Sequence, residues 1–379
     1  MGVSGIFTKE QSDSSTRART GRIVLPHGVV ETPAFMPVGT NATVKAIGPD
    51  SLAEIGFPII LANTYHLFLR PGYELIREAG GLHGYTGWKG NFLTDSGGFQ
   101  IFSLAALRKL SEEGVRFQSH IDGASKFISP EDAVEAQTAF NSDIQMQLDV
   151  CTPWGTEVGE AMKAADLTTR WAMRAKQRWQ QKRNEGYEGE LFGIVQGNFH
   201  KELRRKSMDE ILALDLPGIA IGGLSVGEPF DVFSEFLSHS SSLLPDDKPR
   251  YLMGIGTPDY ILEAVENGID MFDCVFPTRT ARNGLIFTVH GPIAIKKAIY
   301  ARDFGPPDPG CACRVCHSHS RSYLRHLFKC EEILYAMLAT YHNLFFIHNL
   351  VERVRASIRE GQFAAFKRDF LSGYSSPSE

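Results

Sequence analysis

Three cysteines stand close together in the stretch DPGCACRVCHSHS, residues 308–320, with the spacing C-x-C-x-x-C. Thiolates at such short spacings are typical of tetrahedral zinc sites. Cys311, Cys313 and Cys316 would supply three corners of the tetrahedron. The residue types alone leave six candidates for the fourth ligand, namely His317, His319, His326, Cys330, His342 and His348. The spacing therefore predicts a zinc site, and the alternative is a loop with three free thiols.

A second set of reactive side chains follows short apolar runs. Asp95 ends NFLTD, Asp149 ends SDIQMQLD and Asp273 lies in GIDMFDCV. A carboxylate at the end of an apolar strand is costly unless it has a partner or a function. Helix N-caps are the structural alternative, since Asp is common there. That alternative explains Asp273 least well, because apolar residues surround it.

The polar groups near these aspartates complement the edge of guanine, which presents N–H donors and a carbonyl oxygen. Asp149 can accept hydrogen bonds from the base, while the Gln196 amide and the backbone after Gly222-Gly223 can donate to its oxygen. Phe99, after the two glycines of DSGGF, offers a flat surface. Each element alone is weak, since SGG is often a turn and a glutamine can cap a strand.

Eight apolar runs would position these groups, and most of them precede a helix-like segment. Runs without polar alternation favour strands that are buried on both faces, as in parallel sheets. They lie at residues 34–40, 57–64, 91–98, 142–149, 191–197, 218–224, 250–256 and 268–275. Eight strand–helix units over about 250 residues predict a (β/α)8 TIM barrel, whose active site lies at the carboxyl ends of the strands. A doubly wound open sheet is the alternative.

The pattern changes after residue 275. NGLIFTVHGPIAI alternates like a hairpin, the cysteine motif follows, and residues 330–370 form a helical stretch. We therefore expect an N-terminal segment (1–33), the barrel (34–300), a small zinc-binding subdomain (301–342) inserted before the last helix, and a C-terminal helix (343–379) that completes the barrel.

Composition narrows the class of protein. The 379 residues are 43% hydrophobic and 22% charged, which is typical of a globular chain. No membrane-spanning run and no signal peptide are evident, so we expect a cytoplasmic protein. The net charge is −5, but residues 274–379 hold 14 Lys and Arg against 8 acids. This basic third suits a polyanionic partner, although a solvated helix surface explains it equally well.

Seven long motifs together resemble one enzyme family, the queuine-type tRNA-guanine transglycosylases in their bacterial form. They are TPAFMPVGTNATVK, NTYHLFLRPG, LTDSGGFQIFSL, GIVQG, GGLSVGE, YLMGIGTP and MFDCVFPTRTARNG. The resemblance extends from about residue 17 to 370. It implies a barrel with a zinc subdomain, usually a homodimer, that exchanges the wobble guanine of GUN-anticodon tRNAs for 7-aminomethyl-7-deazaguanine (preQ1) in queuosine biosynthesis.

The resemblance also implies roles for individual residues. Asp273 would be the nucleophile that forms a covalent aspartyl-ribose intermediate, and Asp95 would be the general acid and base. The base would be bound by Phe99, Asp149, Gln196, Gly223, Leu224 and Met253. The His of YHNL, which is His342, would complete one structural Zn2+ site per chain. The partners would be the tRNA anticodon loop and a small 7-deazaguanine base, with no membrane.

Two other classes of function compete with this prediction. A non-catalytic RNA-binding subunit would have lost the catalytic aspartate, but Asp273 and Asp95 are present. A metal-dependent hydrolase on the same barrel usually carries H-x-H on its first strand, and AFMPVGT has none.

Val226, where eukaryotic relatives have Gly, predicts a narrow pocket that favours preQ1 over the larger queuine.

Overall fold

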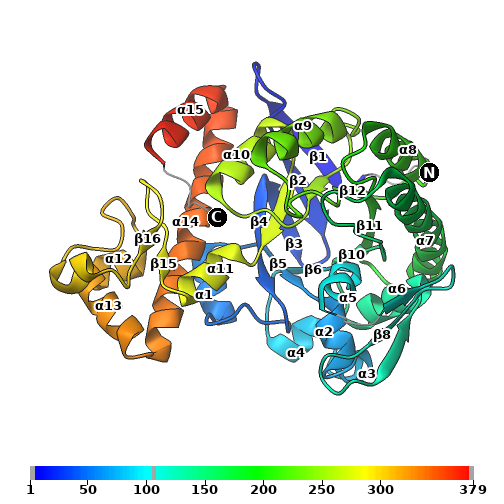
Figure 1. Cartoon of the computed structure of the whole chain (residues 1–379), viewed down its shortest axis with the longest axis horizontal. Coiled ribbons are helices and arrows are strands. Elements are labelled where there is room, and N and C mark those ends of the chain that lie inside the picture. Colours follow the sequence, from blue (N-terminus) through cyan, green and yellow to red (C-terminus); the bar gives the residue numbers. More distant parts are fainter. Residues whose placement is uncertain (1–4, 105–107, 375–379) are drawn as a thin grey trace.

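Eight parallel strands form a closed barrel at the centre of the computed structural model, which describes residues 5–104 and 108–374 (Figure 1). Residues 1–4 and 375–379, at the ends of the expected N-terminal segment and C-terminal helix, lie outside this description. The barrel strands are β4 (Ala34–Gly39), β5 (Ile59–Ala62), β6 (Asn91–Thr94), β10 (Ile144–Met146), β11 (Glu190–Val195), β12 (Gly218–Ile221), β13 (Arg250–Leu252) and β14 (Met271–Cys274). Pairing of β14 with β4, with Met271 opposite Ala34, closes the barrel. All eight strands coincide with predicted runs, so the predicted (β/α)8 barrel is confirmed.

Helices surround the barrel because each strand turns alternate side chains outward. Phe35 of β4 joins the core under the helices, whereas Met36 belongs to a second core inside the barrel. The helices of the ring begin with recognisable signals: α6 (Pro130–Ala139), for example, has Pro130 in its first turn and a Ser129–Asp132 capping box. The others are α1 (Pro49–Ile55), α2 (Thr64–Leu69), α3 (Tyr73–Glu78), α4 (Gly81–Thr86), α5 (Gly98–Leu104), α7 (Val158–Asn184), α8 (Lys201–Leu212), α9 (Phe230–Ser241), α10 (Pro258–Glu266) and α11 (Phe276–Arg282).

A small antiparallel sheet closes the amino-terminal end of the barrel. It consists of β1 (Phe7–Ser12), β2 (Arg19–Leu25) and β3 (Gly28–Thr32). Apolar side chains of this sheet, such as Ile23 and Val30, belong to the same core as the residues inside the barrel. A buried ion pair between Arg19 and Asp270, 2.6 Å long, ties the sheet to the start of β14. The carboxyl ends of the strands are therefore the open end of the barrel.

An excursion of the chain between α5 and α6 forms a second antiparallel sheet, which the sequence analysis did not predict. Its strands β7 (Arg108–Leu110), β8 (Val115–Gln118) and β9 (Ser125–Ile128) pair as an antiparallel sheet. Tyr65 of α2 packs against Phe117 of this sheet, with ring centroids 5.4 Å apart. This places the excursion beside the open end of the barrel.

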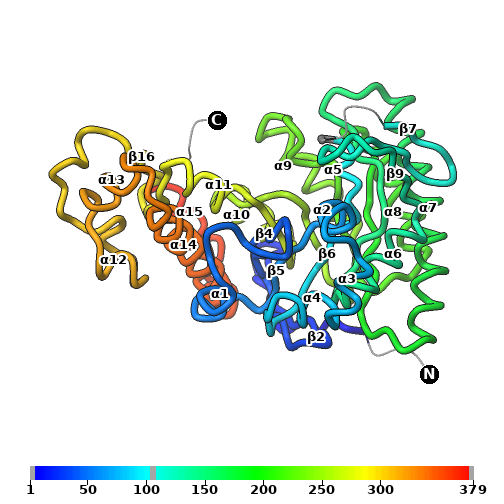
Figure 2. Tube along the Cα trace, turned by 90° about the horizontal axis from the view of Figure 1, so that it is seen from below, coloured from blue at the N-terminus to red at the C-terminus, as the bar shows by residue number. Residues whose placement is uncertain are grey.

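The chain after β14 forms the lobe that carries the cysteine motif. The predicted hairpin is present as β15 (Leu285–Ile286) and β16 (Ile293–Ala294), followed by η1 (Ala298–Arg302), α12 (Arg314–Ser318) and α13 (Arg321–Lys329). Figure 2 shows α12 and α13 at the end of the molecule farthest from α7.

The expected helical stretch 330–370 consists of two helices, α14 (Ile333–Arg359) and α15 (Phe363–Gly373). Gly361, in the left-handed conformation with φ +65°, follows the end of α14 and allows the chain to turn. Helix α14 packs on α11, α1 and β4, so it occupies the eighth position of the helical ring. It also runs through residue 342, and so connects the cysteine lobe to the barrel. No helix within the described ranges is long and apolar enough to cross a membrane.

Candidate active site and metal centre

Asp273 lies on the last barrel strand, where two donors hold its carboxylate. Its Oδ1 accepts hydrogen bonds from the Tyr251 hydroxyl at 2.5 Å and from the Gly254 N–H at 3.0 Å. Burial raises the pKa of Asp273, and these two hydrogen bonds counteract the rise because they favour the ionised form. The arrangement fixes one carboxylate oxygen on the protein, and the other has no hydrogen-bond donor among the described residues.

Asp95 follows the last residue of β6 and is buried. Its Oδ1 accepts from the backbone N–H groups of Thr64 at 2.8 Å and Gly97 at 3.2 Å, and its Oδ2 accepts from the Asn63 amide. Burial raises the pKa of Asp95 to about 6, with a further contribution from the negative charge of Asp273. The two carboxylates thus lie within electrostatic reach of each other. A pKa near 6 allows Asp95 to give and to take a proton near neutral pH.

Asp149 and Gln196 meet side by side from neighbouring strands. The Gln196 Nε2 donates to Asp149 Oδ2 at 2.7 Å, and the Ser96 hydroxyl donates to Asp149 Oδ1 at 3.2 Å. Burial raises the pKa of Asp149 to about 6, against the effect of these two donors. Together they form a buried acceptor and donor set beside the pair of carboxylates.

The loop after β12 approaches the end of the Gln196 side chain so closely that an added Cβ would displace it. Gly223 has φ +67°, and an added Cβ would lie 2.6 Å from Gln196 Oε1. An added Cβ at Gly222 would lie 2.7 Å from Gln196 Nε2. Leu224, the next residue, is buried. The two glycines therefore bring the backbone of this loop to the Gln196 side chain.

Phe99 and Met253, which were predicted to bind the base, are less buried than Asp95 and Asp149. Phe99 lies on the first turn of α5 and is 50% exposed, which leaves its ring free to contact a ligand. Met253 follows β13, is partly buried, and packs against the core inside the barrel.

Sequence reasoning missed the residues that hold the carboxylates. Asn63 and Thr64 bind Asp95, Tyr251 binds Asp273, and Ser96 binds Asp149. Asn63 stands where the predicted run 57–64 ends, so its position was a usable signal. Tyr251 lies inside a strand, where nothing in the sequence distinguishes it from an ordinary core residue.

The cysteine lobe brings the predicted metal ligands together. Cys311, Cys313, Cys316 and His342 form a group whose ligand atoms all lie within 4.8 Å of one another. The three Sγ atoms lie 3.8, 3.3 and 3.3 Å from His342 Nδ1. His342 Nε2 lies 2.7 Å from the Phe287 carbonyl, so donation to this oxygen leaves Nδ1 as the free acceptor.

These residues fit a tetrahedral ion well. Backbone N–H groups of Cys313, Cys316 and Asp308 point at the sulfurs, at 3.5, 3.4 and 3.4 Å, which suits thiolates. The other five candidates for the fourth ligand do not belong to this group. Three sulfurs and one imidazole nitrogen are a donor set that zinc prefers.

Comparison with known proteins assigns the chain to a family. The family model described as queuine tRNA-ribosyltransferase matches residues 13–376. The chain belongs to this family. It is 58% identical to the queuine tRNA-ribosyltransferase of Treponema denticola over 97% of both chains. It is 54% identical to that of Pelotomaculum thermopropionicum, over 97% of this chain and 98% of the relative, and 51% identical to that of Desulforudis audaxviator over 100% of both.

Membership in the queuine tRNA-ribosyltransferase family confirms the resemblance and the expected enzyme class, a tRNA-guanine transglycosylase. The barrel, with its carboxylates at the open end, is consistent with a transferase that forms and breaks a glycosidic bond.

Proposed function

We propose that the protein exchanges the wobble guanine of GUN-anticodon tRNAs for preQ1 through a covalent bond between Asp273 and the ribose. The observation that carries the proposal is the pair of carboxylates, the partly buried Asp273 and the buried Asp95, which lie within electrostatic reach at the open end of the barrel. Two carboxylates beside one anomeric carbon are the arrangement of a retaining glycosidase.

The chemistry follows from these two groups. An oxygen of the Asp273 carboxylate attacks C1′ of the ribose, the C1′–N9 bond breaks, and its electron pair leaves with guanine. Asp95, with a pKa of about 6, supplies the proton that the departing base needs. The incoming base then gives a proton back to Asp95 and attacks C1′, which breaks the ester and frees Asp273. The two displacements together retain the configuration at C1′.

Asp149, Gln196 and Gly223 supply the contacts expected for the edge of a guanine-like base. Asp149 would accept from the ring N–H and the amino group, while Gln196 and the Gly223 N–H would donate to the carbonyl oxygen. The Leu224 carbonyl would accept from the aminomethyl group of preQ1, and Phe99 and Met253 would cover the faces of the ring. The target guanine must leave the anticodon stack to reach these groups.

Positive charge near the open end supports binding of an RNA backbone. Helix α11 follows directly after β14 and carries Arg279 and Arg282, three residues apart. Neither guanidinium has a carboxylate partner among the ion pairs of the described residues. Partial burial lowers the pKa of Arg282, and the positive charge of the neighbouring Arg279 lowers it further. A phosphate would relieve this repulsion, so we assign these two residues to the tRNA backbone.

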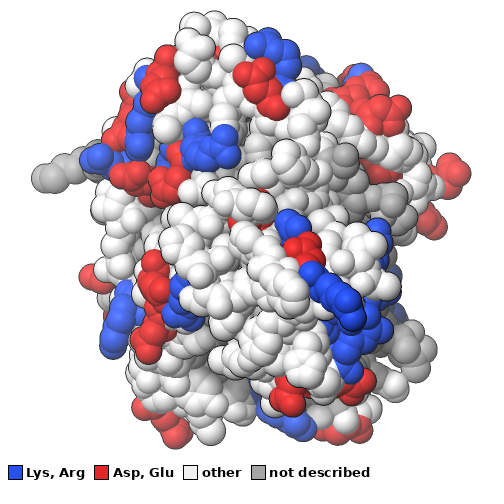
Figure 3. Space-filling view, turned by 90° about the vertical axis from the view of Figure 1, so that its left-hand side faces the viewer, with Lys and Arg blue, Asp and Glu red and all other residues white. Residues whose placement is uncertain are grey.

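Exposed positive charge is also present on the cysteine lobe. Figure 3, which looks onto the end of the molecule that carries this lobe, shows Lys and Arg gathered in a band beside a wide uncharged area. Exposed basic residues of the lobe are Lys296, Lys297, Arg302, Arg314 and Lys329.

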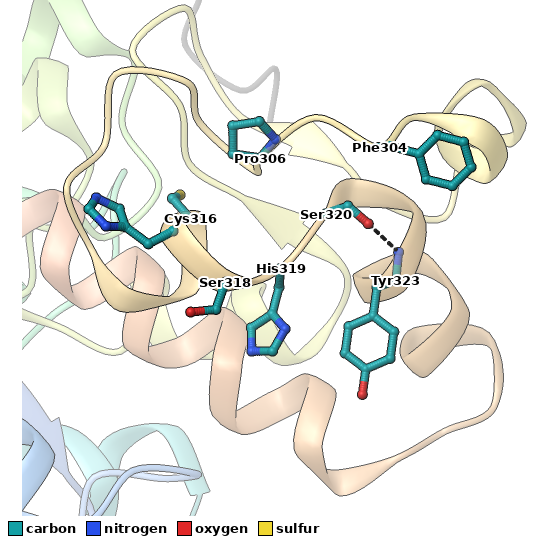
Figure 4. Close-up of a pocket in the computed structure, with 8 residues that line it drawn as sticks. Phe304, Pro306, Cys316, Ser318, His319, Ser320 and Tyr323 are labelled. Atoms are coloured by element: carbon teal, nitrogen blue, oxygen red, sulfur yellow. Dashed lines mark hydrogen bonds between the residues drawn. The ribbon is translucent and has the colours of Figure 1, made fainter.

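Exposed large apolar side chains on and beside the cysteine lobe suit a second copy of the chain. Phe304, Ile299 and Ile333 are 80%, 72% and 77% exposed, which is unusual for side chains of this size. Figure 4 shows Phe304 and Tyr323 at the edge of a cavity of about 490 Å3, where the His319 ring stacks on Tyr323. We therefore expect a homodimer in which this apolar surface is covered, and sedimentation at micromolar concentration tests it.

The Cys3His group would hold one structural zinc ion. Four protein ligands leave no position for a water molecule, so the ion has no part in the exchange. Its effect is mechanical, because three ligands come from one loop and the fourth from α14, which packs on the barrel. The ion would thus fix the lobe, with its basic and apolar surfaces, relative to the open end.

The test is incorporation of labelled guanine into unmodified GUN-anticodon tRNA, followed by trapping of the adduct on denaturing gels. Wild-type protein should incorporate guanine and form an adduct with tRNA, and Asp273→Asn should do neither while it keeps its fold. Asp209→Asn, at an exposed acid on α8, is the matched control and should behave as wild type. Full activity of Asp273→Asn would refute the nucleophile, and tRNA binding without incorporation by wild type would favour the non-catalytic subunit.

A further inference from the structure

A fully buried arginine lies directly beneath the loops that carry the proposed base-binding residues. Arg204, on the first turn of α8, has no exposed surface. Its Nε donates to the Asn198 carbonyl at 2.6 Å, and its Nη2 donates to the carbonyls of Gly222 and Gly223, each at 3.1 Å. One guanidinium thus joins the loop after β11, which begins with Gln196, to the loop after β12, which contains Gly223 and Leu224.

Asn198 extends this connection to a third loop. Its Nδ2 donates to the Thr152 hydroxyl and to the Pro153 carbonyl, both at 2.8 Å. Thr152 follows Asp149 by three residues, in the loop after β10. The backbone of Asn198 is left-handed, with φ +49°, a conformation that Asn tolerates better than most residues. The three loops that supply Asp149, Gln196 and Gly223 are therefore held by two adjacent buried side chains.

The direction of these hydrogen bonds fixes the direction of the backbone donors. In a planar trans peptide the N–H points opposite to the C=O of the same peptide unit. Because the carbonyls of Gly222 and Gly223 point toward Arg204, the N–H groups of Gly223 and Leu224 point away from it. A change at Arg204 would free both peptide units to rotate, which Gly222 and Gly223 allow more readily than other residues.

Electrostatics explain why a charged side chain is retained in this buried position. Burial lowers the pKa of Arg204 to about 10, and the nearby Glu228 carboxylate favours its charged form. Glu228 itself accepts from the backbone N–H groups of Ser225 and Val226, at 2.5 and 2.8 Å. Arg204 thus holds carbonyl groups of the loop after β12, and Glu228 holds two of its N–H groups.

We propose that Arg204 is a positioning residue for base recognition, which acts with Asn198 to fix the relative placement of the three base-binding loops. It contacts no substrate itself. The inference rests on the proposed roles of Asp149, Gln196 and Gly223, and it predicts a selective loss of affinity for the free base.

Steady-state guanine exchange by Arg204→Lys is the central test. Lysine keeps the charge, but its single nitrogen cannot take the places of both Nε and Nη2 of the guanidinium. We expect the KM for guanine to rise at least about tenfold, as expected when a displaced loop no longer makes one of its hydrogen bonds to the base, while the KM for tRNA stays within about twofold. Asn198→Gly keeps the left-handed backbone and removes the link to Thr152 and Pro153, so it should raise the KM for guanine by a smaller factor.

Arg355→Lys is the matched control for the loss of a buried guanidinium. Arg355 donates to the Pro33 carbonyl at 2.7 Å and lies on α14, away from the base-binding loops. It should lose thermal stability as Arg204→Lys does, with both KM values unchanged. If Arg204→Lys is folded and keeps the wild-type KM for guanine, or loses affinity for guanine and tRNA equally, the positioning role is wrong. Absence of exchange by wild-type protein would instead refute the proposed function itself.

Discussion

Replacement of Tyr251 by Phe isolates one hydrogen bond of the proposed nucleophile. The Tyr251 hydroxyl donates to Asp273 Oδ1 at 2.5 Å, and both side chains lie in the barrel wall. A hydrogen bond to a charged group is worth about 1.5–3 kcal/mol, so its loss should raise the pKa of Asp273 by about one to two units. The Gly254 N–H remains as a donor in the variant, which favours the lower part of this range.

The sign of the effect follows from the ionised state of the nucleophile. Attack on C1′ needs the Asp273 carboxylate, so exchange is lost as the pH falls through the pKa of this group. In Tyr251→Phe the acidic limb of kcat/KM should move to higher pH by about one to two units. Below the limb the rate should fall about tenfold to a hundredfold, and it should recover at higher pH.

The assay is labelled guanine incorporation from pH 5 to 9 with saturating guanine and limiting tRNA, so that kcat/KM for tRNA reports the free enzyme. Tyr335→Phe is the control, because Tyr335 is buried in α14 and its hydroxyl has no hydrogen-bond partner within the described chain. An acidic limb that stays at its wild-type pH in Tyr251→Phe would refute the argument that Tyr251 sets the pKa of the nucleophile. A uniform loss at every pH would assign to Tyr251 a role in geometry alone.

Three further predictions concern base affinity, substrate size and the metal. Asp149 accepts hydrogen bonds from the base when it is ionised, and burial raises its pKa to about 6, so the KM for guanine should rise as the pH falls through about 6. Asp149→Asn should bind guanine weakly at every pH. Retention of the pH dependence in this variant would count against Asp149 as a base-binding residue. Val226→Gly should accept queuine better than wild type in competition with preQ1, and equal use of both bases by wild type would contradict the argument from pocket size. His342→Ala should lose about one zinc per chain together with stability, dimer and tRNA affinity, as expected for one structural site, whereas Cys330→Ser, at an exposed cysteine outside the site, should lose none. Normal exchange by a zinc-free, well-folded dimer would exclude the structural role, and loss of chemistry alone would make the metal catalytic.

Much of the fold was open to prediction because its signals are local. Eight runs of apolar residues identified eight strands, since a strand buried on both faces must be apolar throughout its length. The cysteine motif was equally clear, because three thiols in one short loop serve little purpose without a metal. The sheets β1–β3 and β7–β9 were missed, since several of their strands, such as β1 (FTKEQS) and β7 (RKL), are mostly exposed and carry few apolar residues.

The amino-acid sequence by itself determined the barrel, the carboxylates at the ends of its strands, and three of the four ligands of the metal group. Those features depend on residue type and on spacing within one segment. Only the tertiary structure decided which distant groups meet. By residue type and spacing alone His342 was one of six candidates, and the family resemblance singled it out before α14 was seen to bring it to the cysteines. Tyr251 resembled any core residue until β13 paired with β14 beside Asp273. Arg204 has no signal in the sequence, because its partners are backbone carbonyls, which every residue carries and which only folding places within reach of one guanidinium.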